Sequence, residues 1–329
     1  MGGFDVPGGC ESLTDLSIVI VNWNTKEYLL RCLKSVFQPE ARNSWEVILV
    51  DNGSQDGSAG DAKRLFPDIH LIANETNLGF AKATNQGLKH SSGKYLLLLN
   101  PDTEVKQGAI QELVRFMETD PDAGIAGAQL LNEDGSRQNS IANFPSLATE
   151  LLNKSLLRRV FPKKFPGKEK DYVGPIEVDS VIGACMVTRR EALEQVGILD
   201  EDYFLFFEET DWCFRIKKAG WKVFHLPQAK VIHFQGRGAE TKKRQAKVEY
   251  FHSRYHFFRK NRGGLQWFLL LIGLMIKLVV ELISVLIGCL LTGFLIKRWR
   301  KRLSIYAYLM VWHLRFCPSG MGLKPSNNH

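Results

Sequence analysis

Short apolar runs alternate with amphipathic segments through the first two thirds of the chain. The runs LSIVIVN (Leu16–Asn22), EVILV (46–50), IHLIAN (69–74) and YLLLL (95–99) are aliphatic and often β-branched, which is typical of strands buried on both faces. After Thr25, a possible helix cap, apolar residues recur every three or four positions, and this spacing predicts a helix. The alternation predicts an α/β fold, a mostly parallel sheet with helices on both faces and right-handed crossovers.

The second half of this region is less regular. Segment 106–118 is predicted to be a helix, and 132–174 is rich in Lys, Pro, Asn and Ser, so we expect it to cross the surface and shape an acceptor site. Four further stretches predict, in order, a strand, a strand with a helix start, a helix ending at Gly220 and a final strand pair: AGIAGAQLL, EVDSVIGACMVTRR, EETDWCFRIKKAG and WKVFHLPQAKVIHFQG.

Segment 265–296 is apolar enough for a membrane but contains Lys277 and Glu281, which could pair on one helix face because they lie four residues apart. Basic residues flank both ends, so a single span would place one basic cluster outside, against the positive-inside bias. A re-entrant hairpin or an in-plane amphipathic pair is therefore favoured. The alternative is a soluble helical hairpin buried against the main domain or a second subunit.

These patterns divide the chain into a disordered leader (1–15), an α/β domain (16–245) and a basic, apolar, helical region that associates with a membrane (246–329). The formal net charge of +8 comes largely from residues after Lys242. Beside an apolar stretch, such charge favours anionic lipid. Nucleic acid is not expected as a partner, because no nucleic-acid-binding motif accompanies the charge.

The six cysteines are scattered and form no CxxC pair, so neither a disulfide framework nor a zinc site is expected. A reducing compartment is the natural one. The leader has no apolar stretch that would make it a signal peptide. We therefore expect the protein at the cytoplasmic face of the inner or plasma membrane.

Polar residues stand at the ends of the predicted strands, where open α/β sheets bind ligands. Asn22, Asp51, Asn77 and Asp102 lie at or just after such ends. Asp51 could accept a hydrogen bond from a ribose hydroxyl or a pyrimidine imide, or it could simply cap a helix. Asp102 suits Mg²⁺ or Mn²⁺ bound to a diphosphate, and its alternative is a plain Pro-Asp turn.

The stretch FFEETDWCFR places Glu208, Glu209 and Asp211 within one helical turn. So much like charge is costly unless one carboxyl takes up a proton or meets a cation. A general base beside a sugar-binding carboxylate would use this arrangement, whereas an acidic first turn favoured by the helix dipole would not need it. His233, in VIHFQG, is either a metal ligand or a structural histidine.

The order and spacing of these motifs are more specific than any one of them. SIVIVNWN, VILVDNGSQDGS, NLGFAKATNQG, LLLLNPDT, the segment from GACMVTRR to KKAGW, and VIHFQGRG together resemble the family two glycosyltransferases with the GT-A fold. The rhamnosyltransferase-like enzymes of bacterial polysaccharide assembly look nearest, and the resemblance covers about 16–238. It implies inverting transfer from a nucleotide-diphospho-sugar.

The resemblance also implies roles for particular residues. Asp51 would read the nucleotide base, and Asp102 would be the metal ligand retained in an Asp-x-Asp motif whose first position is Asn here, with His233 as a further ligand. The family's acidic pair falls on Glu208 and Glu209. Glu209 would be the base, although the family often has Asp at this second position. The predicted donor-binding set comprises Asn22, Asp51, Asn77, Gly79, Asn85, Asn100 and Arg237.

On resemblance, the donor is dTDP-rhamnose, the metal Mg²⁺ or Mn²⁺, and the acceptor a glycan or a polyprenyl-diphosphate-linked glycan. A nucleotidyltransferase would want a Gly-rich basic loop after the first strand, where this chain has NWNTKEY. A dinucleotide-dependent oxidoreductase would need G-x-G-x-x-G there. A non-catalytic membrane scaffold that kept the fold is the remaining alternative.

Overall fold

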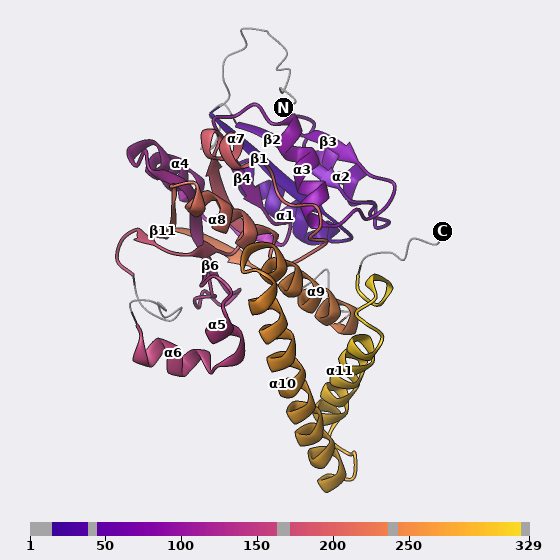
Figure 1. The fold of residues 1–329 in the computed structure, drawn as a ribbon. Coiled ribbons are helices and arrows are strands. Elements are labelled where there is room, and N and C mark those ends of the chain that lie inside the picture. Colours follow the sequence, from indigo (N-terminus) through magenta and orange to yellow (C-terminus); the bar gives the residue numbers. More distant parts are fainter. Residues whose placement is uncertain (1–14, 39–44, 163–171, 236–242, 324–329) are drawn as a thin grey trace.

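The structure is a computed structural model that describes residues 15–38, 45–162, 172–235 and 243–323 (Figure 1). Most of the predicted leader and Arg237 lie outside the described residues. The elements in chain order are β1 (Leu16–Asn22), α1 (Lys26–Val36), β2 (Trp45–Asp51), α2 (Ser58–Leu65), β3 (His70–Ala73), α3 (Phe80–His90), β4 (Tyr95–Leu99), β5 (Thr103–Val105), α4 (Ala109–Thr119), β6 (Ala123–Leu131), β7 (Ile141–Ala142), α5 (Leu147–Leu151), α6 (Lys154–Val160), β8 (Ile176–Glu177), β9 (Ser180–Val181), β10 (Cys185–Arg189), α7 (Arg190–Val196), α8 (Glu208–Lys218), β11 (Lys222–His233), α9 (Lys243–Asn261), α10 (Gly264–Leu291), α11 (Lys297–Leu314) and the short 3₁₀ helix η3 (Ser319–Met321).

The main sheet has the strand order β3-β2-β1-β4-β10-β6-β11-β5, with β8 beside β11. Strands β3, β2, β1 and β4 run parallel to one another, as do β6 and β11. Strand β10 is antiparallel to both β4 and β6, and β5 is antiparallel to β11. The predicted mostly parallel α/β sheet is confirmed, with antiparallel strands in its second half.

Helices cover both faces of this sheet, as predicted. Alternate residues of β1 serve opposite faces, because side chains of a strand point alternately up and down. Ile18 and Ile20 pack with α1, α2 and α4, whereas Val19 and Val21 pack with α3 and α8. Both cores are almost entirely apolar, so the polar residues that end the strands stand out at one edge.

Two details of the sequence interpretation are wrong. The predicted final strand pair is a single strand, β11, with an irregular register between Leu226 and Lys230. Pro227 lies in this irregular stretch, and proline cannot donate to a sheet ladder. No ion pair among the described residues joins Lys277 to Glu281; Lys277 is exposed on α10.

The three C-terminal helices form a third apolar core with the loop that precedes α8. Tyr203 and Phe207 of that loop pack with residues of α9, α10 and α11, so this core joins the two regions predicted to meet at 245/246. Helices α10 and α11 form a hairpin that extends away from the sheet (Figure 1). Within the described residues, α10 alone is long and apolar enough to cross a membrane, and only 22% of its most apolar window is buried.

Candidate active site

Asp51 is held rigidly at the end of β2. The parallel register places it directly opposite Asn22, at the end of β1. The Asn22 Nδ2 donates to Asp51 Oδ1 at 2.9 Å and to Ser58 Oγ at 2.7 Å, and the Ser54 N–H donates to Asp51 Oδ2 at 3.0 Å. Asn22 is fully buried. It therefore fixes the orientation of the Asp51 carboxylate at the sheet edge.

The NLGF loop packs on the segment that leads to α8. The Asn77 Oδ1 accepts from Asn52 Nδ2 at 3.0 Å and from the Gly79 N–H at 2.9 Å. Gly79 has φ +91°, and a Cβ there would lie 2.6 Å from the Phe204 ring, so only glycine fits. The Phe80 N–H donates to the Phe204 carbonyl at 2.7 Å. The loop that contains Asn77 and Gly79 thus connects the end of β2, where the nucleotide is predicted to bind, to the segment before Glu208 and Glu209.

Asn85 has a different environment from a ligand-binding residue. It is fully buried, and its carboxamide exchanges two hydrogen bonds with the backbone of Leu199, at 2.8 and 3.0 Å. Its Nδ2 also donates to Glu201 Oε1 at 3.0 Å. Asn85 therefore fixes the backbone at Leu199, in the segment that leads to α8.

Asp102, which follows β4, and His233, which ends β11, meet at the same carboxyl-end edge of the sheet, next to the register pair of Thr103 and His233. The Asp102 Oδ1 lies 3.5 Å from His233 Nε2, and both residues are nearly buried. Asn100, partly exposed, lies in the same turn and accepts a hydrogen bond from Thr103 through its carbonyl. The two residues that the sequence assigns to the metal therefore lie next to each other, and their role as ligands stays a prediction.

The tautomer of His233 is set by Gln138. The Gln138 Nε2 donates to the His233 carbonyl and to Asn132 Oδ1, each at 3.0 Å, so its Oε1 must be the acceptor for His233 Nδ1 at 2.7 Å. Nδ1 therefore carries a proton, and Nε2 is the ring nitrogen that faces the Asp102 carboxylate. A carboxylate oxygen and the Nε2 of a neutral imidazole are suitable ligands for a divalent cation, so these residues fit the predicted metal.

A second acidic group lies elsewhere. Ligand atoms of Asp200, Asp202 and His256 lie within 4.8 Å of one another. Asp200 already pairs with His256 at 3.1 Å and Lys260 at 2.6 Å. Although burial opposes it, hydrogen bonds, first from Lys260, hold the pKa of Asp200 at about 2. This group joins the loop before α8 to α9.

Glu208 and Glu209 open α8 after an unusual turn. The preceding Phe206 and Phe207 both have φ +71°, a left-handed conformation that is uncommon for bulky residues and often marks functional sites. Each glutamate has a buried Oε2 without a hydrogen-bond partner among the described residues. A Cβ on Gly183 would lie 3.3 Å from Glu209 Cβ, so that glycine leaves room for the side chain.

Burial raises the pKa of both glutamates above that of an ordinary carboxyl group. Burial, then the neighbouring Glu209 charge and that of Glu249, raise the pKa of Glu208 well above its ordinary value. Burial also raises the pKa of Glu209, but backbone N–H groups of Glu209 and Thr210 oppose that shift. We therefore assign the shared proton to Glu208 and the carboxylate to Glu209.

Asp211 lies in the same turn but has another environment. It is fully buried and receives hydrogen bonds from Arg215 Nε at 2.9 Å, Lys260 Nζ at 3.0 Å and Asn261 Nδ2 at 2.8 Å. These bonds tie α8 to α9. Both carboxylate oxygens of Asp211 are therefore already engaged by side chains of α8 and α9, and its predicted catalytic role stays a prediction.

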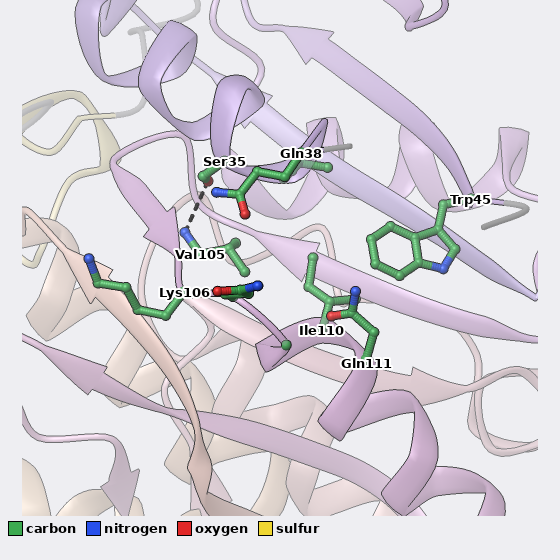
Figure 2. Close-up of a pocket in the computed structure, with 10 residues that line it drawn as sticks. Ser35, Gln38, Trp45, Val105, Lys106, Ile110 and Gln111 are labelled. Carbon is green, nitrogen blue, oxygen red and sulfur yellow. Dashed lines mark hydrogen bonds between the residues drawn. The ribbon is translucent and has the colours of Figure 1, made fainter. Parts of the chain in front are cut away.

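Two cavities lie away from these residues. Figure 2 shows one of about 20 Å³ between α1, β5 and α4, where the Val105 N–H donates to Ser35 Oγ at 3.0 Å. This volume is too small for a nucleotide sugar. A larger cavity of about 480 Å³ lies between α9, α10 and α11, with Arg259, Trp267 and Trp312 in its wall.

Comparison with known proteins identifies the family. The profile described as "Glycosyl transferase family 2" matches residues 17–197. The chain belongs to that family. It is therefore a glycosyltransferase, and the resemblance found in the motifs is confirmed.

Named relatives agree with this class. The chain is 28% identical over 268 residues to the N-acetylglucosaminyl-diphospho-decaprenol L-rhamnosyltransferase of Mycobacterium tuberculosis, with 77% of this chain and 87% of that protein covered. It is 26% identical to the dTDP-rhamnosyl transferase RfbF of Shigella flexneri, covering 68% and 70%. The mannosyltransferase PcManGT of Pyrobaculum calidifontis, solved with GDP-Man and Mn²⁺, superposes with a TM-score of 0.56 at 16% identity, over 95% and 90% of the chains.

Sequence reasoning missed three residues of this glycosyltransferase. Gln138 orients His233, Gly183 makes room for Glu209, and Tyr250 of α9 packs on the turn before Glu208 at 5.2 Å from the Phe207 ring. Gln138 lies in the segment expected to shape the acceptor site, and nothing in its composition marks it. Each of these contacts joins positions far apart in the sequence.

Proposed function

We propose that this enzyme transfers a sugar, with inversion, from a nucleotide-diphospho-sugar to a glycan or lipid-linked glycan, with Glu209 as the base. The observation that carries the proposal is the pair of Glu208, which is buried, and Glu209, which is partly buried, after a strained turn. The NLGF loop couples that turn to the strand ends that carry Asp51. A carboxylate with a raised pKa at such a position suits proton abstraction.

Asp51 supports a pyrimidine nucleotide. Its carboxylate is fixed by Asn22 and Ser54, so it can accept a hydrogen bond from an imide N–H of thymine or uracil. The two rhamnosyltransferase relatives support rhamnose, and dTDP-rhamnose is the proposed donor. Asn77, Gly79 and Asn100 shape the loops around it, and Asn22 and Asn85 act as positioning residues.

Asp102 and His233 would hold Mg²⁺ or Mn²⁺. The structural relative solved with GDP-Man and Mn²⁺ supports a divalent ion, but that likeness concerns the fold. Such an ion would neutralise charge on the leaving nucleoside diphosphate. Gln138 holds a proton on His233 Nδ1, so that Nε2 would be the nitrogen that binds the ion, and Asp102 would supply the negative charge.

Glu209 accepts the proton of the acceptor hydroxyl as that oxygen attacks the anomeric carbon from the face opposite the nucleotide. One displacement breaks the bond to the diphosphate, forms the new glycosidic bond and inverts the centre. Glu208, which keeps its proton, prevents a second negative charge beside the base. The turn at Phe206 and Phe207 holds both carboxyl groups at the start of α8.

Binding of the donor is the first expected outcome. Calorimetry with UDP-, dTDP- and GDP-sugars, each with and without Mn²⁺, is expected to show metal-dependent binding of dTDP-rhamnose about tenfold tighter than of the GDP-sugars, since a guanine does not offer the same imide edge to Asp51. If another nucleotide-sugar binds more tightly, that sugar would replace dTDP-rhamnose as the proposed donor. Absence of binding across the panel would favour a scaffold that kept the fold.

The lipid-linked acceptor implies a membrane surface, and the cytoplasmic face is proposed from the compartment that the cysteines favour. Helix α10 presents exposed apolar side chains on its outer half: Ile276, Val280, Ile283, Leu286, Ile287 and Leu290. Basic residues at both helix ends add attraction to anionic lipid. These side chains are what we propose to enter the bilayer interface.

The double variant Ile276→Glu, Val280→Glu is expected to bind vesicles of phosphatidylglycerol and phosphatidylcholine at least tenfold more weakly, because two charges enter the apolar face. Flotation of the full chain measures it. Both positions are more than half exposed, so the fold is retained. Leu65→Glu on α2, also half exposed, is the matched control. Unchanged flotation of the double variant would refute the role of α10.

A further inference from the structure

We propose that Lys247 and Arg254 of α9 bind the diphosphate of a lipid-linked acceptor. The inference rests on the proposed function, because it names the part of the acceptor that the enzyme recognises apart from the sugar. The two residues lie seven positions apart, which places them on one side of the helix, two turns from each other.

Two aromatic rings hold the two cations close together. The Lys247 Nζ lies 5.3 Å from the centre of the Tyr250 ring and 5.7 Å from that of Phe251. The Arg254 guanidinium lies 4.7 Å from each of the same ring centres. Both cations therefore flank one aromatic pair that orients them, and these four side chains form the platform that we propose for the anion.

This platform packs against the turn of Phe206 and Phe207 that precedes Glu208. The Tyr250 ring is 5.6 Å from that of Phe206 and 5.2 Å from that of Phe207, the two strained residues before the acid pair. Negative charge on Glu209 is also among the causes that raise the pKa of Tyr250, after burial. One aromatic layer thus separates the base from the cations.

The other side of the platform leads to the apolar hairpin. Arg254 Nε lies 3.2 Å from Glu150 Oε2 of α5. The next residue, Leu151, packs so closely on α10 that a Cβ on Gly273 would lie 2.6 Å from its side chain. The cations therefore stand between the base and the root of α10. In a lipid-linked glycan the diphosphate likewise stands between the sugar and the apolar chain.

The charges at this place favour an added anion. Lys247 is exposed, and no described carboxylate lies within ion-pair distance of its ammonium. Burial of its stem and then the Arg254 charge lower the pKa of Lys247, with Lys277 acting in the same direction and Glu281 and Glu150 against it. A bound diphosphate would relieve the repulsion among the three cations and form charge-assisted hydrogen bonds.

The test uses farnesyl diphosphate with the full chain in detergent, in the Asp102→Asn background and with a chelator present. These conditions remove the proposed metal site, which would otherwise hold a diphosphate. Calorimetry is expected to show binding that Lys247→Gln weakens about tenfold, the size of one lost charge-assisted contact. Farnesol is expected to bind at least tenfold more weakly than farnesyl diphosphate. No donor is needed, so a wrong donor assignment would not affect the result.

Arg259→Gln is the matched control, an exposed arginine at the other end of α9, beside the larger cavity. It should bind farnesyl diphosphate as the parent does. Equal affinity for farnesol and farnesyl diphosphate, or an unchanged affinity in Lys247→Gln, would overturn the proposal. A loss confined to Arg259→Gln would move lipid recognition to the cavity between α9, α10 and α11 and would also overturn it.

Discussion

Replacement of Glu209 by Gln is expected to lower kcat by roughly 10²- to 10⁴-fold while donor affinity changes little. The amide has nearly the same shape, so it keeps the packing against Gly183 and the start of α8. It cannot take the proton of the acceptor hydroxyl, because its nitrogen and oxygen have no basic lone pair of comparable strength. The effect is large because no second free carboxylate stands in the same turn: Asp211 is held by Arg215 and Lys260.

Steady-state transfer assays, with calorimetry of donor binding on the same preparation, measure this effect. Glu208→Gln is the matched control, since Glu208 already carries a proton and glutamine resembles that neutral form. This variant should keep transfer within about tenfold of the parent, because it leaves the base in place. A near-normal rate in Glu209→Gln would show that Glu209 is not the base. A greater loss in Glu208→Gln than in Glu209→Gln would assign the base to Glu208.

The same pair predicts the pH dependence. The pKa of Glu209 is raised, so transfer should fall as pH drops through a value above the ordinary 4.5 of a glutamate. For stability, a raised folded pKa means that the protonated form stabilises the fold fully below 4.5, and this contribution is lost as pH rises through the folded pKa. Glu208→Gln should therefore unfold at higher urea concentration than the parent near neutral pH.

The strand ends show what the sequence could predict. Apolar runs define the strands, and a parallel arrangement brings their carboxyl ends to one edge. Asn22 and Asp51 are therefore expected to lie close together, and they are register partners in the structure. The meeting of Asp102 with His233 also follows from motif order, although β5 and β11 pair in the antiparallel sense. Local pattern and family spacing suffice for such positions, because each residue is tied to a strand end.

Roles that depend on long-range partners could not be predicted in this way. Glu208, Glu209 and Asp211 look alike in the sequence, yet Lys260 and Asn261, some 50 positions later, decide that Asp211 ties two helices together. Asn85 likewise lies in a donor-loop motif but bonds to Leu199, more than a hundred positions away. In each case burial and partners, which a single sequence does not display, set the role of a polar group.

Two groups among the described residues could hold a divalent ion, Asp102 with His233 and Asp200 with Asp202 and His256, and replacement of Asp102 distinguishes between them. Asp102→Asn is expected to remove the metal-dependent part of donor binding and to lower the transfer rate by roughly 10²- to 10³-fold, since a metal supplies several kcal/mol of charge stabilisation. The neutral amide keeps the size of the side chain beside His233 but no longer offers a charged oxygen.

Asp202→Asn is the matched control for Asp102→Asn. Asp202 belongs to the group with Asp200 and His256, and it is exposed, so its replacement should not disturb the fold. Calorimetric titration of Mn²⁺ in the presence of nucleoside diphosphate should give binding in Asp202→Asn and none in Asp102→Asn. The reverse pattern would place the metal at Asp200. That site is disfavoured because Lys260 already neutralises Asp200 at 2.6 Å, and a cation entering there would have to displace the lysine.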